Sequence, residues 1–116
     1  NIAAKLSTTT GTVSTSSTYG KHYNYGTPNY CNKVYKYGNI ITYTCSFYST
    51  TAVPQAQALF TLPTGYRPTR KIDISITKVG YGNSYNGFID ANGSVAIGNN
   101  SIDANVWYSI SATFII

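Results

Sequence analysis

The sequence predicts an all-β fold, a β-sandwich or jelly-roll-like head domain, from its residue types, its short strand-like runs and its frequent turn residues. Thr, Tyr, Ile and Val, which suit pleated sheets, are abundant, whereas Glu is absent and Leu is scarce. A chain of 116 residues has the length of one domain. No apolar run approaches the roughly 20 residues of a membrane span. We therefore expect one β domain over residues 1–116, without a helical bundle, a coiled coil or membrane insertion.

The strand-like runs are clearest after residue 30. Runs over 31–36 and 40–48 flank Tyr37-Gly38-Asn39, which predicts a hairpin with a three-residue turn. Further strands are predicted over 58–62, 71–79, 88–89, 95–97 and 106–116, with a loop over 80–87. About seven short strands with a turn roughly every 8–12 residues are typical of a sandwich, jelly roll or barrel.

The first 30 residues differ in composition from the rest of the chain. Residues 7–20 are almost all small and hydroxylic, so they fit either a linker or one or two exposed strands. Residues 19–30 interleave Tyr with Gly and Pro, which predicts a loop. The chain begins Asn1-Ile2, and we expect it to be the C-terminal piece of a longer polypeptide.

The spacing of the two cysteines bears on whether they can form a disulfide. A three-residue turn centred on Gly38 would place Cys31 directly opposite Cys45, where a cross-strand disulfide is conceivable. A two-residue turn at Gly38-Asn39 would break that match. Two buried thiols are the alternative.

Catalytic groups are scarce. The three acids are all Asp, and Asp90 and Asp103 lie in turn-like sequence, whereas glycoside hydrolysis needs two facing carboxyl groups. His22 is the only His, and no G-x-S-x-G elbow accompanies it. Cys31, Cys45 and His22 lack the close ligand pairs of a zinc site. The sequence predicts no enzyme, no metal site and no cofactor.

The charge balance favours an acidic partner. Eight Lys and Arg against three Asp give 8 − 3 = +5. The basic residues are scattered, however, and only residues 67–71 are dense in them. Without a zinc finger, a basic helix or an RNP-type motif, we do not expect nucleic acid as the partner.

The 12 Tyr residues indicate a binding surface, because each buried hydroxyl needs a partner and so many cannot all be core. Aromatic faces beside amides and hydroxyls suit sugar rings. Trp107 lies on a predicted strand, and we expect it more in the core than in a site. The saccharide-binding candidates are Tyr19, His22, Tyr23, Tyr25, Arg67, Tyr81, Asn83, Tyr85, Asn86 and Trp107.

Three segments in this order carry a family resemblance. They read VYKYGNIIT over 34–42, LFTLPTGYRP over 59–68 and GFIDANGSVAI over 87–97, and an aromatic-containing strand follows. The chain over about residues 31–116 resembles the C-terminal receptor-binding head domains of tailed-bacteriophage tail and baseplate proteins. Gly38, Pro63, Gly65, Pro68 and Gly93 in these motifs are expected to set turns. The motifs therefore indicate the fold more than the ligand.

The resemblance implies a homotrimeric β-sandwich head in the virion, at the tail tip or baseplate. It further implies contact with other tail proteins and recognition of host cell-wall polysaccharide outside the cell. The positive charge would steer such a head toward phosphate-rich wall polymers. A purely structural trimerising module and a polysaccharide depolymerase are the alternatives.

Overall fold

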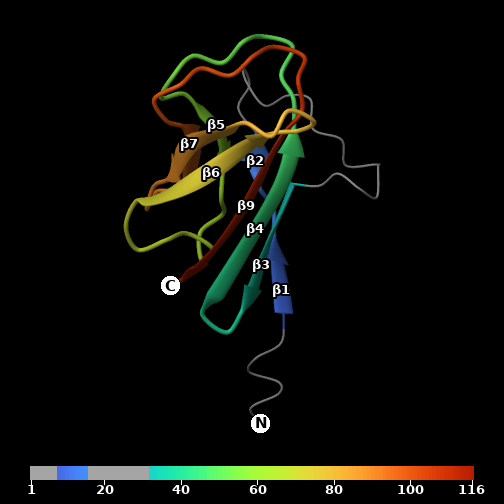
Figure 1. Ribbon diagram of the computed structural model, residues 1–116. Helices are drawn as coiled ribbons and strands as arrows, with labels where there is room; N and C mark the ends of the chain where they lie inside the picture. The colour runs from blue at the N-terminus through green and yellow to red at the C-terminus, as the bar shows by residue number, and fades with distance from the viewer. Residues whose placement is uncertain (1–7, 16–31) are drawn as a thin grey trace.

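The computed structural model describes residues 8–15 and 32–116, and these form an all-β fold, as predicted (Figure 1). Its strands are β1 (Thr8–Gly11), β2 (Ser14–Thr15), β3 (Asn32–Tyr37), β4 (Ile40–Phe47), β5 (Ala58–Thr61), β6 (Ile72–Lys78), β7 (Ser84–Ile89), β8 (Ser94–Ile97) and β9 (Tyr108–Ile115). They pair antiparallel in one continuous sheet of order β1-β3-β4-β9-β6-β7-β8-β5-β2.

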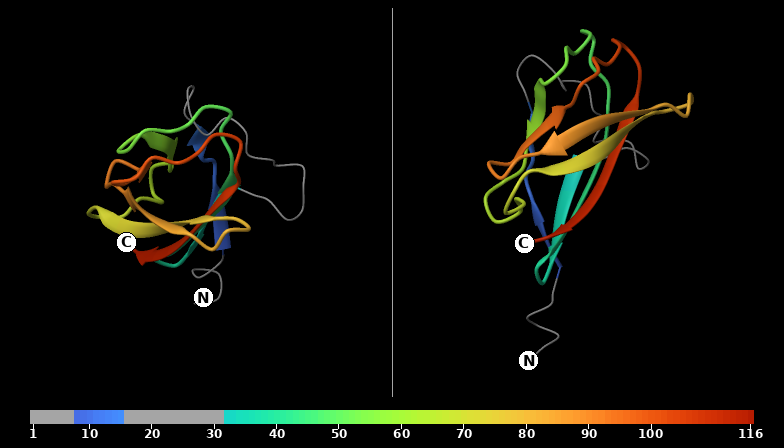
Figure 2. Two further views of the ribbon diagram at one scale, coloured as in Figure 1. Left: turned by 45° about the horizontal axis from the view of Figure 1, so that its top comes forward. Right: turned by 60° about the vertical axis from the view of Figure 1, so that its left-hand side comes forward.

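The sheet is strongly curled. Strands β1 and β2 are the two edges of the sheet, yet only Thr12 and Val13 separate them in the chain. The three Cα–Cα steps from Gly11 to Ser14 span at most about 11 Å, so the sheet has to bend until its edges approach one another. Figure 2 shows the resulting half-barrel from its end. The described strands thus form a single curled sheet, whereas the sequence predicted the two packed sheets of a sandwich.

The concave face of the sheet holds the core. In β4, Ile41, Tyr43, Cys45 and Phe47 are buried and alternate with half-buried hydroxylic residues, which confirms the predicted two-residue period. The buried hydroxyl of Tyr43 donates to Asn32 Oδ1 at 2.8 Å. Tyr43 and Tyr108 are both fully buried, so part of the tyrosine surplus is core.

The resemblance motifs do set turns, as expected. Gly38, Gly65 and Gly93 have φ of 61°, 92° and 92°, in the left-handed region that favours glycine. Two backbone hydrogen bonds close the 90–94 hairpin, from Asp90 N to Ser94 O at 2.9 Å and from Gly93 N to Asp90 O at 2.9 Å.

The predicted three-residue turn between β3 and β4 is wrong. Tyr37 pairs with Ile40, so the turn contains only Gly38 and Asn39. This register places Asn32 opposite Cys45, so the expected pairing on which the conceivable disulfide rested is wrong. Cys31 itself lies outside the described residues.

Two further segments differ from the simplest expectation. Residues 84–87, predicted as loop, are the first part of β7, because their backbone pairs with β6 despite the Gly and Asn content. Of the hydroxylic stretch 7–20, residues 8–11 and 14–15 are strands that pair with β3 and β5. Nowhere in the described ranges is there a helix long and apolar enough to cross a bilayer.

Candidate functional site

An open pocket of about 560 Å³ lies where two distant loop segments part. Val53 and Ile102 exchange two backbone hydrogen bonds of 3.0 Å, and Ala56 N donates to Gly98 O at 3.0 Å. Between these ties, residues 54–55 and 99–101 diverge and line the pocket. The fold therefore holds both ends of each segment and leaves the middle of each open.

The lining is polar but uncharged. Gln55, Asn99 and Asn100 supply side-chain amides and Ser101 supplies a hydroxyl, while Pro54 and Tyr85 supply apolar surface. The loop residues are exposed and Tyr85 is half-buried. Amides can donate and accept hydrogen bonds, so this set suits a ligand that carries many hydroxyl groups.

Asn86 positions one wall of the pocket. Its Oδ1 accepts a hydrogen bond from Asn99 N at 3.1 Å, and its backbone oxygen accepts one from Gly98 N at 2.8 Å. A Cβ at Gly98 would lie 2.1 Å from Asn86 Nδ2, so only glycine allows this close approach. Asn86 was predicted as a binding residue; its side chain holds the loop that carries Asn99 and Asn100.

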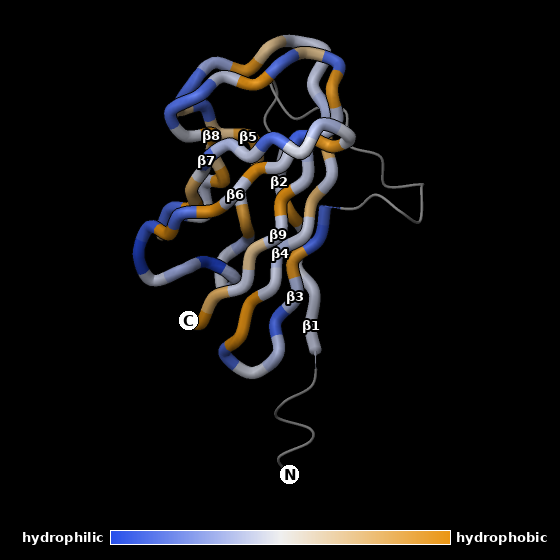
Figure 3. Tube along the Cα trace, viewed as in Figure 1, coloured by the Kyte–Doolittle hydropathy of each residue, from blue (hydrophilic) through white to orange (hydrophobic). Residues whose placement is uncertain are grey.

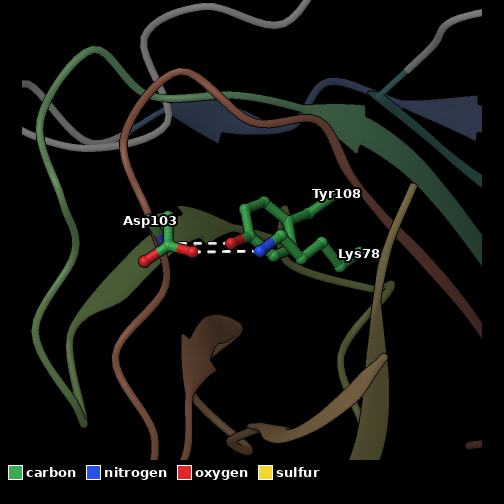
Figure 4. Close-up of polar contacts among 3 residues, drawn as sticks. All are labelled: Lys78, Asp103 and Tyr108. Atoms are coloured by element: carbon green, nitrogen blue, oxygen red, sulfur yellow. Dashed lines mark hydrogen bonds and ion pairs between the residues drawn. The ribbon is translucent and has the colours of Figure 1, made fainter. Parts of the chain in front are cut away.

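A second anchor follows the pocket loop (Figure 4). The Tyr108 hydroxyl accepts a hydrogen bond from Asp103 N at 2.9 Å, and Lys78 Nζ donates to Asp103 Oδ2 at 3.1 Å. The Tyr108 ring also lies edge-on to Tyr85, with centroids 6.1 Å apart. Tyr108 thus contacts the aromatic residue of the pocket and anchors the loop that forms its wall.

These anchors shift two titrating groups. The hydrogen bond with Asp103 raises the pKa of the Lys78 ammonium above its ordinary 10.5. Burial raises the pKa of the Tyr108 phenol above its ordinary 10.0. Lys78 is therefore cationic at neutral pH, as its ion pair with Asp103 requires, and burial favours the neutral form of Tyr108.

The structure separates the other predicted residues from the pocket. Tyr81 is 67% exposed, and Lys78 Nζ lies 4.4 Å from its ring centroid, over one face of the ring. Asn83 closes the β6–β7 turn by accepting a hydrogen bond from Lys78 N through its backbone oxygen, at 2.8 Å. Trp107 is half-buried outside the core cluster, edge-on to Tyr48 with centroids 4.8 Å apart, so its expected core position is wrong.

Arg67 lies at the opposite end of β6 from Tyr81 and Asn83, beside Leu62 and Gly93. Tyr19, His22, Tyr23 and Tyr25, the remaining predicted residues, lie outside the described residues. Of the predicted set, Tyr85 lines the pocket and Asn86 supports it.

The sequence reasoning missed the rest of the lining. Its signal was present as a loop of amides and hydroxyls after Gly98, but nothing local indicated that this loop faces Gln55. That proximity comes from the pairing of Val53 with Ile102, which are far apart in sequence.

The expected turn roles of the acids are only partly right. In the 90–94 hairpin the side-chain cap is Asn92, whose Oδ1 accepts from Ser94 N at 3.0 Å, while Asp90 contributes its backbone. Asp103 pairs with Lys78. Among the described side chains that line the pocket there is no carboxylate, and the described residues contain no cluster of three or more His, Cys, Asp or Glu suited to a metal ion.

Comparison with models of known protein families gives no match, and comparison with curated proteins gives none either.

Proposed function

We propose that this chain is the receptor-binding head of a phage tail or baseplate protein and that it binds host cell-wall polysaccharide. The observation that carries the proposal is the pocket of Tyr85, Gln55 and the 99–101 loop. Its volume falls within the range of roughly 300–1,000 Å³ common for small-ligand sites, enough for one or two sugar rings.

The chemistry of the lining supports a saccharide ligand. The Tyr85 ring offers an apolar face for a sugar ring, and the amides of Gln55 and Asn100 can bond hydroxyls in either sense. Hydrolysis would need two facing carboxyl groups, which the described lining lacks. The proposal is therefore one of binding, with depolymerisation as the poorer alternative.

The resemblance motifs support the same assignment. Gly38, Gly65 and Gly93 of these motifs occupy turns with positive φ, as the resemblance implies. On this basis the head belongs to the virion and acts outside the cell. It would be mounted on other tail or baseplate proteins.

An exposed apolar corner supports assembly into a homotrimer. Tyr37, Ile40 and Ile115 are cross-strand neighbours on the convex face, and their exposed fractions are 50%, 42% and 67%. Ile116 N donates to Asn39 O at 2.9 Å, so the C-terminus is fixed beside this corner. We propose that copies of the chain meet there, which would remove these side chains from water.

The binding test is a titration of purified host wall polysaccharide against the whole chain. Gln55→Ala and Asn100→Ala should each weaken binding about two- to tenfold through loss of one or two hydrogen bonds. Asn83→Ala is the matched control, since it removes an exposed amide outside the pocket. Equal effects of all three variants would place the site elsewhere, and release of reducing ends would indicate a depolymerase.

The assembly test is light scattering at tens of micromolar. We expect a trimer for the natural chain and dissociation for Ile40→Lys together with Ile115→Lys. Thr113→Lys, an exposed position on the same face outside the apolar corner, is the control for added charge. A monomer in every case would contradict the trimer, and a trimer without polysaccharide binding would favour the purely structural module.

A further inference from the structure

The turn that leads into β6 concentrates positive charge. Arg67, Arg70 and Lys71 lie within five residues, and we call these three residues the basic turn. Lys36 on β3 approaches it, with its Nζ 5.9 Å from the ring centroid of Tyr66. Figure 3 shows this stretch as strongly hydrophilic where the chain enters β6.

Arg67 is held in one orientation. Its Nε donates to Leu62 O at 2.8 Å, and a Cβ at Gly93 would lie 2.6 Å from the same Nε. Because the guanidinium is planar, fixing Nε also fixes the directions of the two amino groups. Arg67 is half-buried, and its hydrogen bond within the described residues runs from Nε, so neither amino group is bonded to a described acceptor.

The charge of the basic turn is not neutralised by its neighbours. In residues 8–15 and 32–116 the ion pair between Lys78 and Asp103 is the only one, so Asp73 and Asp90 pair with none of these cations. Lys71 instead rests on Phe88, with its Nζ 3.9 Å from the ring centroid. A cation–π contact fixes an ammonium group without cancelling its charge.

We propose that the basic turn binds the oxyanion groups, phosphate or carboxylate, repeated along an acidic glycan. A fixed guanidinium presents parallel N–H donors that match the two oxygens of such a group. Arg70 and Lys71, both exposed, supply further positive charge beside it. The proposal rests on the proposed function only in taking the ligand to be a saccharide.

The aromatic residues of this region argue against nucleic acid. Single-stranded nucleic acids bind by stacking bases on open aromatic faces. Here Lys71 covers one face of Phe88 and Lys36 approaches Tyr66, whose hydroxyl is bonded to Thr9 Oγ1 at 3.1 Å. These cations would compete with bases for the ring faces.

The basic turn and the pocket are separate surfaces. Tyr85 pairs with Ile76 near the end of β6, whereas the basic turn precedes Ile72 at its start. The four residue steps from Ile72 to Ile76 span about 13 Å at the strand rise of roughly 3.3 Å. One glycan chain could therefore place a neutral sugar in the pocket and a charged group on the turn.

The test is a titration of the whole chain with sodium polygalacturonate and with long-chain polyphosphate, which separate the two oxyanions. Neutral dextran and single-stranded DNA are the comparison polymers. Arg67→Gln should weaken binding of the preferred acidic polymer about tenfold or more, and Arg70→Gln about threefold or more. Lys33→Gln removes the same charge on the convex face of β3 and should change binding less than twofold. Binding by either acidic polymer with this ranking of variants supports the proposal.

Three outcomes would overturn it. Equal losses from Arg67→Gln, Arg70→Gln and Lys33→Gln would mean unspecific attraction, absence of binding to both acidic polymers would remove the site, and tighter binding of DNA would make nucleic acid the ligand. Arg70 is exposed, so its variant remains informative even if Arg67→Gln unfolds the turn. Asn100→Ala should leave binding of polyphosphate unchanged, because that polymer has no sugar ring for the pocket, and this separates failure of the pocket from failure of the basic turn.

Discussion

The two ends of the β6–β7 hairpin carry surfaces of different character. At one end the basic turn presents a fixed guanidinium and further cations. Toward the other end, Tyr85 lies beside a pocket lined by neutral amides and a hydroxyl. The first surface suits discrete anionic groups, and the second suits uncharged hydroxyls. A chain with a net charge of +5 therefore need not bind through charge everywhere.

The two surfaces are also built differently. The pocket exists because segments more than 40 residues apart are tied at Val53–Ile102 and Ala56–Gly98. The basic turn is contiguous in sequence, and its long-range neighbours are Gly93 beside Arg67 and Phe88 beneath Lys71. A change that loosens the 98–103 loop should therefore affect the pocket alone, and a change at Gly93 should affect the turn alone.

The largest expected effect concerns Tyr108. Tyr108→Ala should lower the free energy of unfolding by about 3–5 kcal/mol, because it removes a fully buried ring that stacks on Phe47 at 5.9 Å. Tyr108→Phe should lower it by only about 1 kcal/mol, through loss of the bond from Asp103 N. Urea unfolding measures both values.

Tyr108→Phe also separates the two surfaces. It should weaken polysaccharide binding at the pocket while leaving binding of acidic polymers at the basic turn unchanged. Equal weakening at both surfaces would show that they are coupled through the core, which would contradict the expectation that the pocket and the basic turn respond independently.

A smaller effect is expected at Gly93. Gly93→Ala should cost about 1–3 kcal/mol of stability, because it combines strained φ with a Cβ 2.6 Å from Leu62 O and from Arg67 Nε. Gly82→Ala is the matched control: its φ is 76°, but a Cβ there meets nothing within 4 Å. Thermal unfolding should rank Gly93→Ala as the more damaging, and only Gly93→Ala should weaken binding at the basic turn.

Salt should affect the two surfaces unequally. Raising the salt concentration from about 0.05 to 0.5 M should weaken binding of an acidic polymer roughly tenfold or more, because bound counterions are released on association. Neutral sugar at the pocket should bind with nearly constant affinity over this range. Calorimetric titrations at several salt concentrations measure both, and a steep dependence at the pocket would contradict its neutral character.

The sequence predicted what depends on local chemistry. The alternation in β4 and the turns at Gly38, Gly65 and Gly93 follow from period and backbone preference, and the structure confirms them. The concentration of basic residues over 67–71 is likewise visible in the sequence.

The predictions that failed depend on pairing between segments that are far apart in the sequence. The β3–β4 turn has two residues where three were predicted, and this difference of one residue places Asn32 opposite Cys45, in the position expected for Cys31. Strands β1 and β2 form the two opposite edges of one sheet, and this distinguishes a curled sheet from a sandwich. Nothing in the sequence of either strand indicates it. In the same way Tyr85 was predicted, but its neighbours Gln55 and Asn100 were not, because backbone bonds between distant segments bring them together.

The smallest expected effect is that of Asp103 at neutral pH. Its side chain is 67% exposed, so Asp103→Asn should change the free energy of unfolding little at pH 7. Asp90→Asn should leave host adsorption largely intact.

The two variants differ at high pH. The pKa of Lys78 is raised in the folded chain, so the stabilisation from its pair with Asp103 is present below pH 10.5 and is lost as pH rises through the shifted pKa. The raised pKa of Tyr108 acts in the same direction above pH 10.0, because its ionised form is disfavoured in the core. Unfolding measured between pH 8 and 12 should therefore show falling stability for the natural chain and for Asp90→Asn, with a shallower fall for Asp103→Asn. Identical alkaline profiles for all three chains would mean that the loop beside the pocket is held by Tyr108 and the backbone alone, with no contribution from Lys78.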